Sequence, residues 1–481
     1  MNCNNWIAGE WIGSDECIDN INPSDTRDII GAFAQASASE LDYAVTAAEK
    51  AQRIWQSTGL EKKQNVLDSI GRELISRCDE LGELLAREEG KTFPEGRGEV
   101  FRAGQFFTYY AAEVLRQIGD TADSVRPGIE IDVRREPLGV VGIISPWNFP
   151  VATASWKIAP ALAFGNAVIW KPANLTPASA VALAEIIAKQ DIPPGLFNLV
   201  MGPGGTIGNA LTAHPHVQAI SFTGSVQVGR TVAANAANNF SKVQLEMGSK
   251  NGLLIMDDAD LDLAVQASAN GAFGSTGQKC TASSRLIVHE SIHDVFVDKL
   301  VKHMQDLVVG HALESGTQIG PVASSSQLSE NLRYLSVGQD EGAALVYGGE
   351  LLERSTPGHF MRPALLTQTD NRMTVNREEM FAPIACVIPV GSYEEGLSAV
   401  NDTLFGLTSG IMTQSLARAN HFRRNAKTGC VMVNLPTAGT DYHVPFGGRG
   451  SSSYGSREQG QYAVEFYTTV KTAYVSMGDP A

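Results

Sequence analysis

Hydrophobic residues along the chain follow two different spacings. Residues 39–57 place apolar side chains at intervals of three and four, which predicts a helix with Ser39 as its N-cap. From residue 138 onward, short runs rich in Val and Ile alternate with helical stretches. The predicted strands cover residues 138–145, 166–173, 197–202, 218–225, 243–248 and 252–257, and helices are predicted at 179–190 and 228–237. Continuous apolar strands that alternate with helices are typical of an α/β fold whose parallel sheet is covered on both faces.

A second set of elements begins near residue 250. Helices predicted at 261–276 and 292–308, together with later strands, indicate a second α/β unit with its own sheet. Two strand-like segments belong to neither unit, and β extensions of this kind often pair with another subunit. The sequence therefore predicts three parts: a first unit of residues 1–120 and 136–248, a second unit of residues 249–448, and a β extension of residues 121–135 and 461–481.

Composition narrows the classes of partner. The 481 residues include 37 Lys and Arg against 52 Asp and Glu, which gives a net charge of −15. This surplus argues against binding to nucleic acid or to an anionic membrane. Residues 137–156 carry no charge, but their prolines and Asn148 favour a buried strand, loop and helix over a membrane span. The first residues lack the basic and apolar segments of a signal peptide.

Cysteine usage indicates a reducing compartment. The six cysteines are scattered and form no C-x-x-C pair: Cys3, Cys17, Cys78, Cys280, Cys386 and Cys430. Their spacing predicts reduced thiols in a cytoplasmic protein and argues against a zinc site.

One cysteine lies in a setting suited to chemistry. Cys280 follows the glycine-rich, polar segment FGSTGQK, where nearby N–H groups can lower the pKa of a thiol; the alternative is a small buried hydrophobe. A thiolate nucleophile needs a base and an oxyanion donor. Glu246 ends a predicted strand and Asn148 lies in the loop WNFP, so both are candidates. The alternatives are a solvated carboxylate for Glu246 and a turn-capping amide for Asn148.

Other polar residues follow the ends of predicted strands. Lys171 ends the strand VIWKPA, and an open α/β sheet binds its ligand at the carboxyl ends of its strands. Gly224 and Ser225 form a turn between a strand and a helix, which suits a phosphate. The glycine-rich segment 202–208 lacks the G-x-G-x-x-G spacing and supports no such prediction.

Taken in order, these segments resemble the NAD(P)-dependent aldehyde dehydrogenase superfamily. The motifs are PWNFP, KP, FTGSxxxG, LExG and GQxC, followed by EEMFAP at 378–383 and PFGG at 445–448. The resemblance runs from NWIAGEW near the start of the chain to FYTTVKT near its end. It implies an aldehyde dehydrogenase fold in which the first unit is a Rossmann-like NAD(P)-binding domain and the second is the catalytic domain. The β extension would then join a homodimer or a homotetramer.

The resemblance also implies a role for each matching residue. Cys280 matches the nucleophile, Glu246 the general base, and Asn148 the amide that forms the oxyanion hole with the backbone N–H of Cys280. The cofactor-binding positions are Ile144, Trp147, Lys171, Asn174, Gly224, Ser225, Glu379 and Phe381. Where the family usually has Gly-Gly after the base, this chain has Gly248-Ser249, and Ser249 is expected to add a hydrogen bond or to restrict the backbone slightly. The implied reaction oxidises an aldehyde to an acid through a thiohemiacetal and a thioester.

Cofactor choice depends on one position. Many NAD-specific members carry Glu three residues after the lysine, where it binds both ribose hydroxyls and repels a 2′-phosphate. Asn174 removes that charge, so we expect the protein to accept NADP as well as NAD.

The resemblance places five residues at the substrate. They are Arg102, Gln105, Phe149, Trp156 and Phe446. Arg102 and Gln105 share one helix face, and Arg102 either anchors a substrate carboxylate or pairs with Glu99 at the surface. Trp156 stands where many succinic semialdehyde dehydrogenases carry Arg, which argues against that substrate.

Longer segments, among them GKTFPEGRGEVFRAGQFF, are similar to the α-ketoglutaric semialdehyde (2,5-dioxopentanoate) dehydrogenase branch. The expected substrate is therefore a small carboxylated semialdehyde. The alternatives are another semialdehyde or an aromatic or heteroaromatic aldehyde. Two more remote alternatives are a non-catalytic homologue, against which the intact Cys280, Glu246 and Asn148 argue, and a thiol hydrolase that needs no cofactor.

Overall fold

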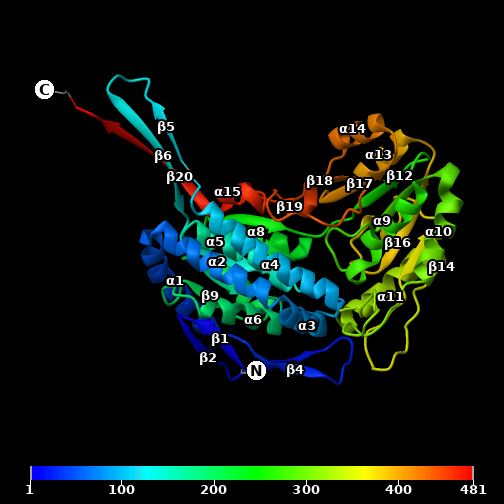
Figure 1. Ribbon diagram of the computed structural model, residues 1–481, viewed down its shortest axis with the longest axis horizontal. Helices are drawn as coiled ribbons and strands as arrows, with labels where there is room; N and C mark the ends of the chain where they lie inside the picture. Colours follow the sequence, from blue (N-terminus) through cyan, green and yellow to red (C-terminus); the bar gives the residue numbers. More distant parts are fainter. Residues whose placement is uncertain (1–2, 117–118, 479–481) are drawn as a thin grey trace.

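The computed structural model describes residues 3–116 and 119–478. Residues 1–2, 117–118 and 479–481, which fall in the predicted first unit and β extension, lie outside the described residues. Two large sheets form separate lobes, and a narrow three-stranded arm projects from the lobe that contains the N-terminus (Figure 1).

The first lobe contains an eight-stranded sheet. In spatial order its strands are β19 (Ser453–Tyr454), β11 (Lys242–Glu246), β10 (Ala219–Thr223), β7 (Val140–Ile144), β8 (Ala167–Lys171), β9 (Phe197–Leu199), β1 (Asn4–Ile7) and β2 (Glu10–Gly13). The five central strands, β7 to β11, run parallel, and β8 is buried at every position, as its continuous apolar sequence predicts. The short β19 pairs antiparallel with β11 and places Ser453 opposite Glu246.

Helices cover this sheet on the way from strand to strand. They are α1 (Ala38–Ser57), α2 (Leu60–Ser76), α3 (Cys78–Glu89), α4 (Phe93–Glu113), α5 (Pro150–Ala163), α6 (Pro177–Ala188), α7 (Asn209–Thr212), α8 (Val226–Asn238) and α15 (Val464–Tyr467). Helix α5 packs on β7 and β8, and α4 packs on α5. The uncharged residues 137–156 therefore include the whole of strand β7, a loop and the start of the buried helix α5.

The second lobe has a seven-stranded sheet of its own. In order its strands are β14 (Ala344–Tyr347), β15 (Ala364–Thr367), β16 (Ile384–Val390), β13 (Arg285–His289), β12 (Gly252–Ile255), β17 (Thr408–Met412) and β18 (Cys430–Val433). All neighbours are parallel except β14 and β15. The accompanying helices are α9 (Leu261–Phe273), α10 (His293–Gln305), α11 (Ser325–Asp340), α12 (Thr374–Arg377), α13 (Tyr393–Asn401) and α14 (Leu416–Asn425).

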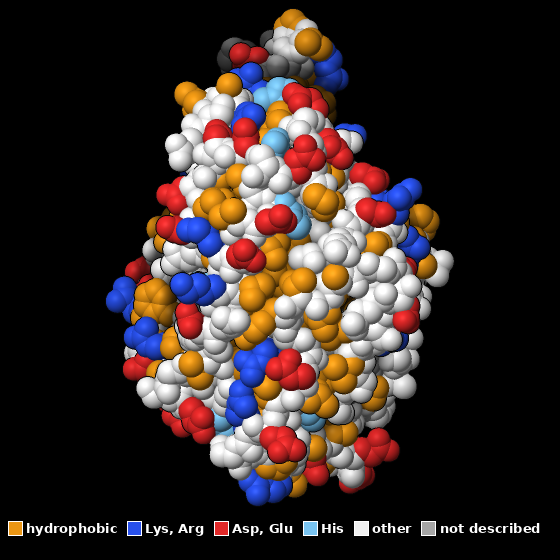
Figure 2. Space-filling view, turned by 90° about the vertical axis from the view of Figure 1, so that its right-hand side faces the viewer, with side chains coloured by type: hydrophobic (Ala, Val, Ile, Leu, Met, Phe, Trp, Pro, Cys, Tyr) orange, Lys and Arg blue, Asp and Glu red, His pale blue; other side chains and the backbone are white. Residues whose placement is uncertain are grey.

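Surface charge is mixed on the outer face of the second lobe. Figure 2 shows acidic and basic side chains interspersed there with apolar ones, so the negative net charge is not gathered on this face. Among the described residues, no helix is both long and apolar enough to cross a membrane.

The arm consists of β5 (Gly119–Asp123), β6 (Ile129–Pro137) and β20 (Thr468–Ser476), with β6 in the middle. Residues 129–137 pair antiparallel with residues 468–476, so the arm joins two segments that are far apart in the sequence (Figure 1). From its second residue on, β20 is exposed throughout, and its apolar Val470 and Tyr474 are 53% and 60% exposed.

Two local predictions need correction. Helix α1 is capped by Ser37 and not by Ser39, because Ser37 and Glu40 form a reciprocal capping box. Cys3 and Cys17 form a disulfide, whereas the sequence predicted only reduced thiols. The hairpin of β1 and β2 leads back to Cys3, and the chain then enters β3 (Cys17–Ile21), which pairs with β4 (Ile29–Ala34); the two Cα atoms are thereby 6.1 Å apart.

Candidate active site

A cavity of about 440 Å³ lies where the ends of β7, β8, β10 and β11 face the loops of the second lobe. Thirteen of the sixteen predicted site residues line it: Ile144, Trp147, Asn148, Phe149, Trp156, Lys171, Gly224, Ser225, Glu246, Cys280, Glu379, Phe381 and Phe446. The lining does not include Arg102, Gln105 or Asn174. Motifs spread over more than 300 residues thus converge because parallel strands end at one edge of a sheet.

Cys280 lies in a tight loop after the 3₁₀ turn Gly274–Gly277. Ser275 and Thr276 have φ values of 51° and 54°, and Gly277 has φ +67° with Ala382 too close to allow a Cβ. Burial raises the pKa of the Cys280 thiol, and the nearby charges of Glu379 and Glu246 raise it further. The thiol therefore has to lose its proton before its sulfur can act as a nucleophile.

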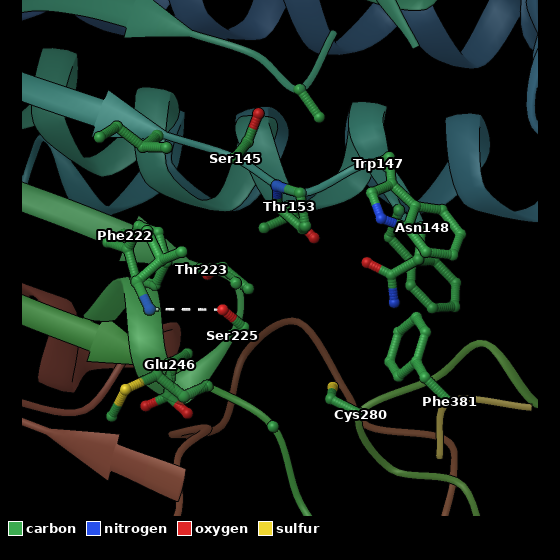
Figure 3. A pocket seen from close by; sticks show the side chains of 18 of the residues that line it. Ser145, Trp147, Asn148, Thr153, Phe222, Thr223, Ser225, Glu246, Cys280 and Phe381 are labelled. Carbon is green, nitrogen blue, oxygen red and sulfur yellow. Dashed lines mark hydrogen bonds between the residues drawn. The ribbon is translucent and has the colours of Figure 1, made fainter. Parts of the chain in front are cut away.

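Asn148 follows β7 and points its amide toward Cys280 across the cavity (Figure 3). One N–H of the amide donates to the backbone oxygen of Gln278 at 2.9 Å. An Asn amide has two N–H groups, so the other can donate to an oxygen that forms next to Cys280.

Glu246 closes the cavity at the end of β11. Its Oε2 accepts a hydrogen bond of 2.6 Å from the Ser453 hydroxyl. Burial raises the pKa of Glu246 well above its ordinary value and Glu458 raises it further, whereas the hydrogen bond from Ser453 lowers it. Behind Glu246, the buried Lys157 forms an ion pair with Glu458 and donates to Ser221 at 3.0 Å. Burial and Glu458 thus favour the protonated form of Glu246, whereas Ser453 and Lys157 favour its carboxylate form.

The turn after β10 has the geometry predicted for phosphate. Ser225 is the N-cap of α8, and its hydroxyl accepts from the N–H of Val228 at 3.4 Å (Figure 3). The Thr223 hydroxyl is buried without a hydrogen-bond partner among the described residues. Across the cavity, Lys171 donates to the Pro172 oxygen at 2.8 Å, and burial lowers the pKa of Lys171 to about 8. The unpaired Thr223 hydroxyl, the N-terminal turn of α8 and the Lys171 ammonium fit a bound dinucleotide.

Glu379 and Phe381 come from the second lobe. Glu379 accepts the N–H of Ser249 at 2.9 Å, and a Cβ at Gly248 would overlap its carboxylate. The hydroxyl of Ser249 donates to Asn251 at 2.7 Å, so Ser249 adds the expected hydrogen bond. Phe381 has φ 53° and lies edge-on to Trp147, with ring centroids 5.4 Å apart.

The opposite end of the cavity is aromatic. Trp156 lies 5.9 Å from Phe446 and 5.7 Å from Phe106 between ring centroids. Phe106 in turn contacts Tyr442, over whose ring Arg102 lies at 5.4 Å from the centroid. Arg102 therefore stands at the outer end of an aromatic cluster whose inner members line the cavity.

The alternative pairing of Arg102 with Glu99 is wrong. Glu99 is buried, and its carboxylate binds Lys91 and two backbone N–H groups instead. Gln105 is half-buried one turn from Arg102 and outside the cavity lining. Asn174 donates to Gln35 at 3.4 Å, close to the lining residues Lys171 and Ala173 in sequence.

Ser453 and Gln327 also contribute to the site, although neither was predicted from the sequence. Ser453 binds Glu246, and Gln327 lines the cavity while donating to the backbone oxygens of Met380 and Phe381 at 3.3 and 3.4 Å. The position of Ser453 shortly after the PFGG motif could have marked it as a site residue. Gln327, inside an ordinary helical pattern, gave no signal.

Comparison with known proteins decides the family. A model described as the aldehyde dehydrogenase family matches residues 11–473. The chain belongs to this family. Alpha-ketoglutaric semialdehyde dehydrogenase of Bacillus subtilis is 42% identical over 479 residues, which cover 98% of this chain and 97% of the relative. The 2,5-dioxopentanoate dehydrogenase of Saccharolobus solfataricus is 34% identical, over 97% of this chain and 98% of the relative.

Solved structures agree with this assignment. Betaine aldehyde dehydrogenase from Staphylococcus aureus in complex with NAD⁺ has a TM-score of 0.97 at 30% identity, covering 100% of this chain and 96% of that chain. A putative aldehyde dehydrogenase from Burkholderia cenocepacia has a TM-score of 0.96 at 33% identity, over 100% and 99%. The expected aldehyde dehydrogenase fold is confirmed, and the protein is an NAD(P)-dependent aldehyde dehydrogenase.

Proposed function

We propose that Cys280, Asn148 and Glu246 carry out aldehyde oxidation in this cavity. The main support is that the thiol and the amide face each other while the carboxylate borders the same space. Cys280 gives its proton to water, and the resulting thiolate adds to the aldehyde carbon. Asn148 and the backbone N–H of Cys280 donate to the resulting oxyanion.

The second half of the reaction releases the acid. Collapse of the oxyanion expels hydride from the former aldehyde carbon and leaves a thioester on Cys280. Lys171, Ser225 and Glu379 would hold NAD(P)⁺, which would supply the acceptor for this hydride. Glu246 then takes a proton from water, the hydroxide adds to the thioester carbon, and the carbon–sulfur bond breaks to restore Cys280.

Two substitutions test these roles. Cys280→Ala should abolish aldehyde-dependent NADH formation, because no other described residue in the cavity offers a thiol. Glu246→Gln should retain a burst of about one NADH per site, followed by slow turnover, because only thioester hydrolysis needs the base. Oxidation of aldehydes by Cys280→Ala at the parent rate would falsify the proposal.

For the substrate, we propose a carboxylated semialdehyde of the α-ketoglutaric semialdehyde type. Two relatives that match almost the whole chain carry the names alpha-ketoglutaric semialdehyde and 2,5-dioxopentanoate dehydrogenase. The positive charge of Arg102, at the outer end of the aromatic cluster, is opposite to that of a substrate carboxylate. Among the described residues, no carboxylate forms an ion pair with its guanidinium. An Arg in such a position can bind a carboxylate through two hydrogen bonds.

Matched pairs of aldehydes test this anchor. Arg102→Ala should raise KM for α-ketoglutaric semialdehyde by roughly tenfold to a hundredfold, the loss of one charge-assisted contact of about 1.5–3 kcal/mol. KM for an uncharged aldehyde of similar length should stay the same. Arg102→Lys, which keeps the charge but not the planar fork, should fall between the two. An equal rise for charged and uncharged aldehydes would contradict the anchor.

An aromatic aldehyde is the second candidate. It is favoured by one observation, the aromatic walls formed by Phe149, Trp156 and Phe446. Aromatic side chains stack on a planar ring at little cost in conformational entropy. A panel in which benzaldehyde outperforms every carboxylated aldehyde in kcat/KM would favour this alternative.

We also propose that the protein forms a homodimer or homotetramer through its arm. We propose in addition that it works in the cytoplasm, because four of its cysteines are free thiols and only Cys3 and Cys17 are paired. The support for assembly is the exposed β20, which carries Val470 and Tyr474. An exposed apolar edge strand presents unpaired N–H and C=O groups with which another chain can pair.

A further inference from the structure

A buried lysine lies directly behind the loop that carries Asn148. The side chain of Lys91 is 1% exposed, and its Nζ donates to the backbone oxygen of Asn148 at 2.6 Å. The same Nζ lies 4.0 Å from the centre of the Phe149 ring. Lys91 thus contacts the oxyanion amide's own backbone and the next residue, but it does not line the cavity.

Glu99 extends this contact to the helix that follows Asn148. One carboxylate oxygen accepts from Lys91 at 2.6 Å, and the other accepts from the N–H groups of Val151 and Ala152 at 2.9 and 3.1 Å. These N–H groups belong to the first turn of α5, where no helical partner is available to them. Lys91 and Glu99 therefore bind the segment from Asn148 to Ala152 at two points.

Glu95, between them in sequence, reaches the other lobe. Its Oε1 accepts from the backbone N–H of Ser275 at 2.7 Å and from the Ser275 hydroxyl at 2.9 Å. Its Oε2 closes the capping box of α4 with Thr92. Ser275 is the first of three consecutive residues with positive φ that lead to Cys280. Glu95 thus holds the loop of the nucleophile.

We propose that Lys91, Glu95 and Glu99 form a clamp, here called the α4 clamp, that sets the position of Asn148 relative to Cys280. This inference rests on the roles proposed above for those two residues. The three members are positioning residues, because each acts through the backbone of a neighbouring loop. A misplacement of about 1 Å can slow a reaction roughly a hundredfold, so such contacts can control rate without touching substrate.

Two reactions of Cys280 separate positioning from general loss of structure. Single-turnover NADH formation, with the aldehyde that the parent enzyme oxidises fastest, needs both the thiol and the oxyanion hole. Alkylation by iodoacetamide needs only the thiol, because it forms no oxyanion. Lys91→Met should slow NADH formation about tenfold to a hundredfold, by analogy with the loss or displacement of an oxyanion donor, and should change alkylation less than about threefold.

Glu95→Ala should slow NADH formation and also change the alkylation rate, because it releases the Cys280 loop. Thr92→Val is the matched control: it removes the hydroxyl that binds the other oxygen of Glu95 and should move neither rate. If Lys91→Met does not fold, Lys91→Met/Glu99→Gln carries the same test without an unpaired buried carboxylate. Circular dichroism and thermal melting establish folding in each case.

A double-mutant cycle shows whether Lys91 acts through Asn148. In an Asn148→Ala background, Lys91→Met should slow NADH formation by less than about threefold, because the amide that Lys91 positions is absent. Equal losses in both backgrounds, or equal losses in NADH formation and alkylation, would overturn the clamp and leave Lys91 a stabilising residue only. Undiminished NADH formation by Asn148→Ala alone would instead overturn the proposed function.

Discussion

Removal of the Ser453 hydroxyl should move the pH dependence of turnover upward. The hydroxyl donates to Oε2 of Glu246 at 2.6 Å and accepts the N–H of Gly448, also at 2.6 Å. A donor stabilises the carboxylate against the carboxylic acid, so Ser453→Ala should raise the pKa of Glu246 beyond the increase already caused by burial and by Glu458.

The size of the shift follows from the hydrogen bond. A hydrogen bond to a charged group contributes about 1.5–3 kcal/mol, and one pKa unit corresponds to about 1.4 kcal/mol. Water that enters the space left by the hydroxyl recovers part of the loss, so we expect a shift of about one unit. Because Glu246 works as a base only when deprotonated, kcat should fall about tenfold below its pKa and approach the parent value above it.

The assay is kcat measured from about pH 6 to 10 by NADH absorbance, with the NADH burst recorded separately as a measure of acylation. Ser453→Thr, which keeps a hydroxyl, should restore the parent profile. The reasoning is refuted if the pH limb stays in place or moves to lower pH, or if Ser453→Ala loses the same fraction of kcat at every pH.

Three further outcomes follow from the site and the arm. The parent enzyme should use NADP with a kcat/KM within about a thousandfold of that for NAD, a difference of about 4 kcal/mol. Asn174→Glu should increase the ratio of kcat/KM for NAD to that for NADP. An unchanged ratio would contradict a role for this position in cofactor choice. Burial and the charges of Glu379 and Glu246 raise the pKa of the Cys280 thiol. Alkylation of the free enzyme by iodoacetamide should therefore become roughly tenfold faster per pH unit up to pH 9. A rate that stops rising below that pH would show that the thiolate has already formed. Replacement of Val470 and Tyr474 by Lys should reduce the mass found by light scattering to the 51.4 kDa of one chain; an unchanged mass would place the interface elsewhere.

The strands that carry the site were readable from the sequence. β8 falls inside the predicted strand 166–173 and β10 inside 218–225, because a strand buried on both faces has a continuous apolar run. Lys171 and Ser225 then follow at the strand ends, where the fold places ligand contacts. The correct N-cap of α1 could also have been predicted from the sequence, because Ser37 and Glu40 have the spacing of a capping box.

Contacts between segments far apart in the sequence could not be predicted from these patterns. Ser453 meets Glu246 only because β19 returns from the second lobe to the edge of the first sheet. Cys3 and Cys17 meet only through a hairpin turn. In both cases the residue types and their spacing carry no period or motif, and the pairing depends on tertiary structure alone.

The backbone groups around Asn148 explain why the buried charges of Lys91 and Glu99 lie behind the loop that carries this residue. A buried ion pair such as Lys91 and Glu99 often adds no more stability than apolar residues of the same volume, so stability alone is a weak reason for it. The loop between β7 and α5, however, presents a carbonyl at Asn148, and the first turn of α5 presents N–H groups at Val151 and Ala152 that have no helical partner. Buried backbone groups need partners. An ammonium and a carboxylate satisfy both ends at once and, being directional, also fix where the loop lies. An apolar core could fill this space but could not orient the Asn148 amide.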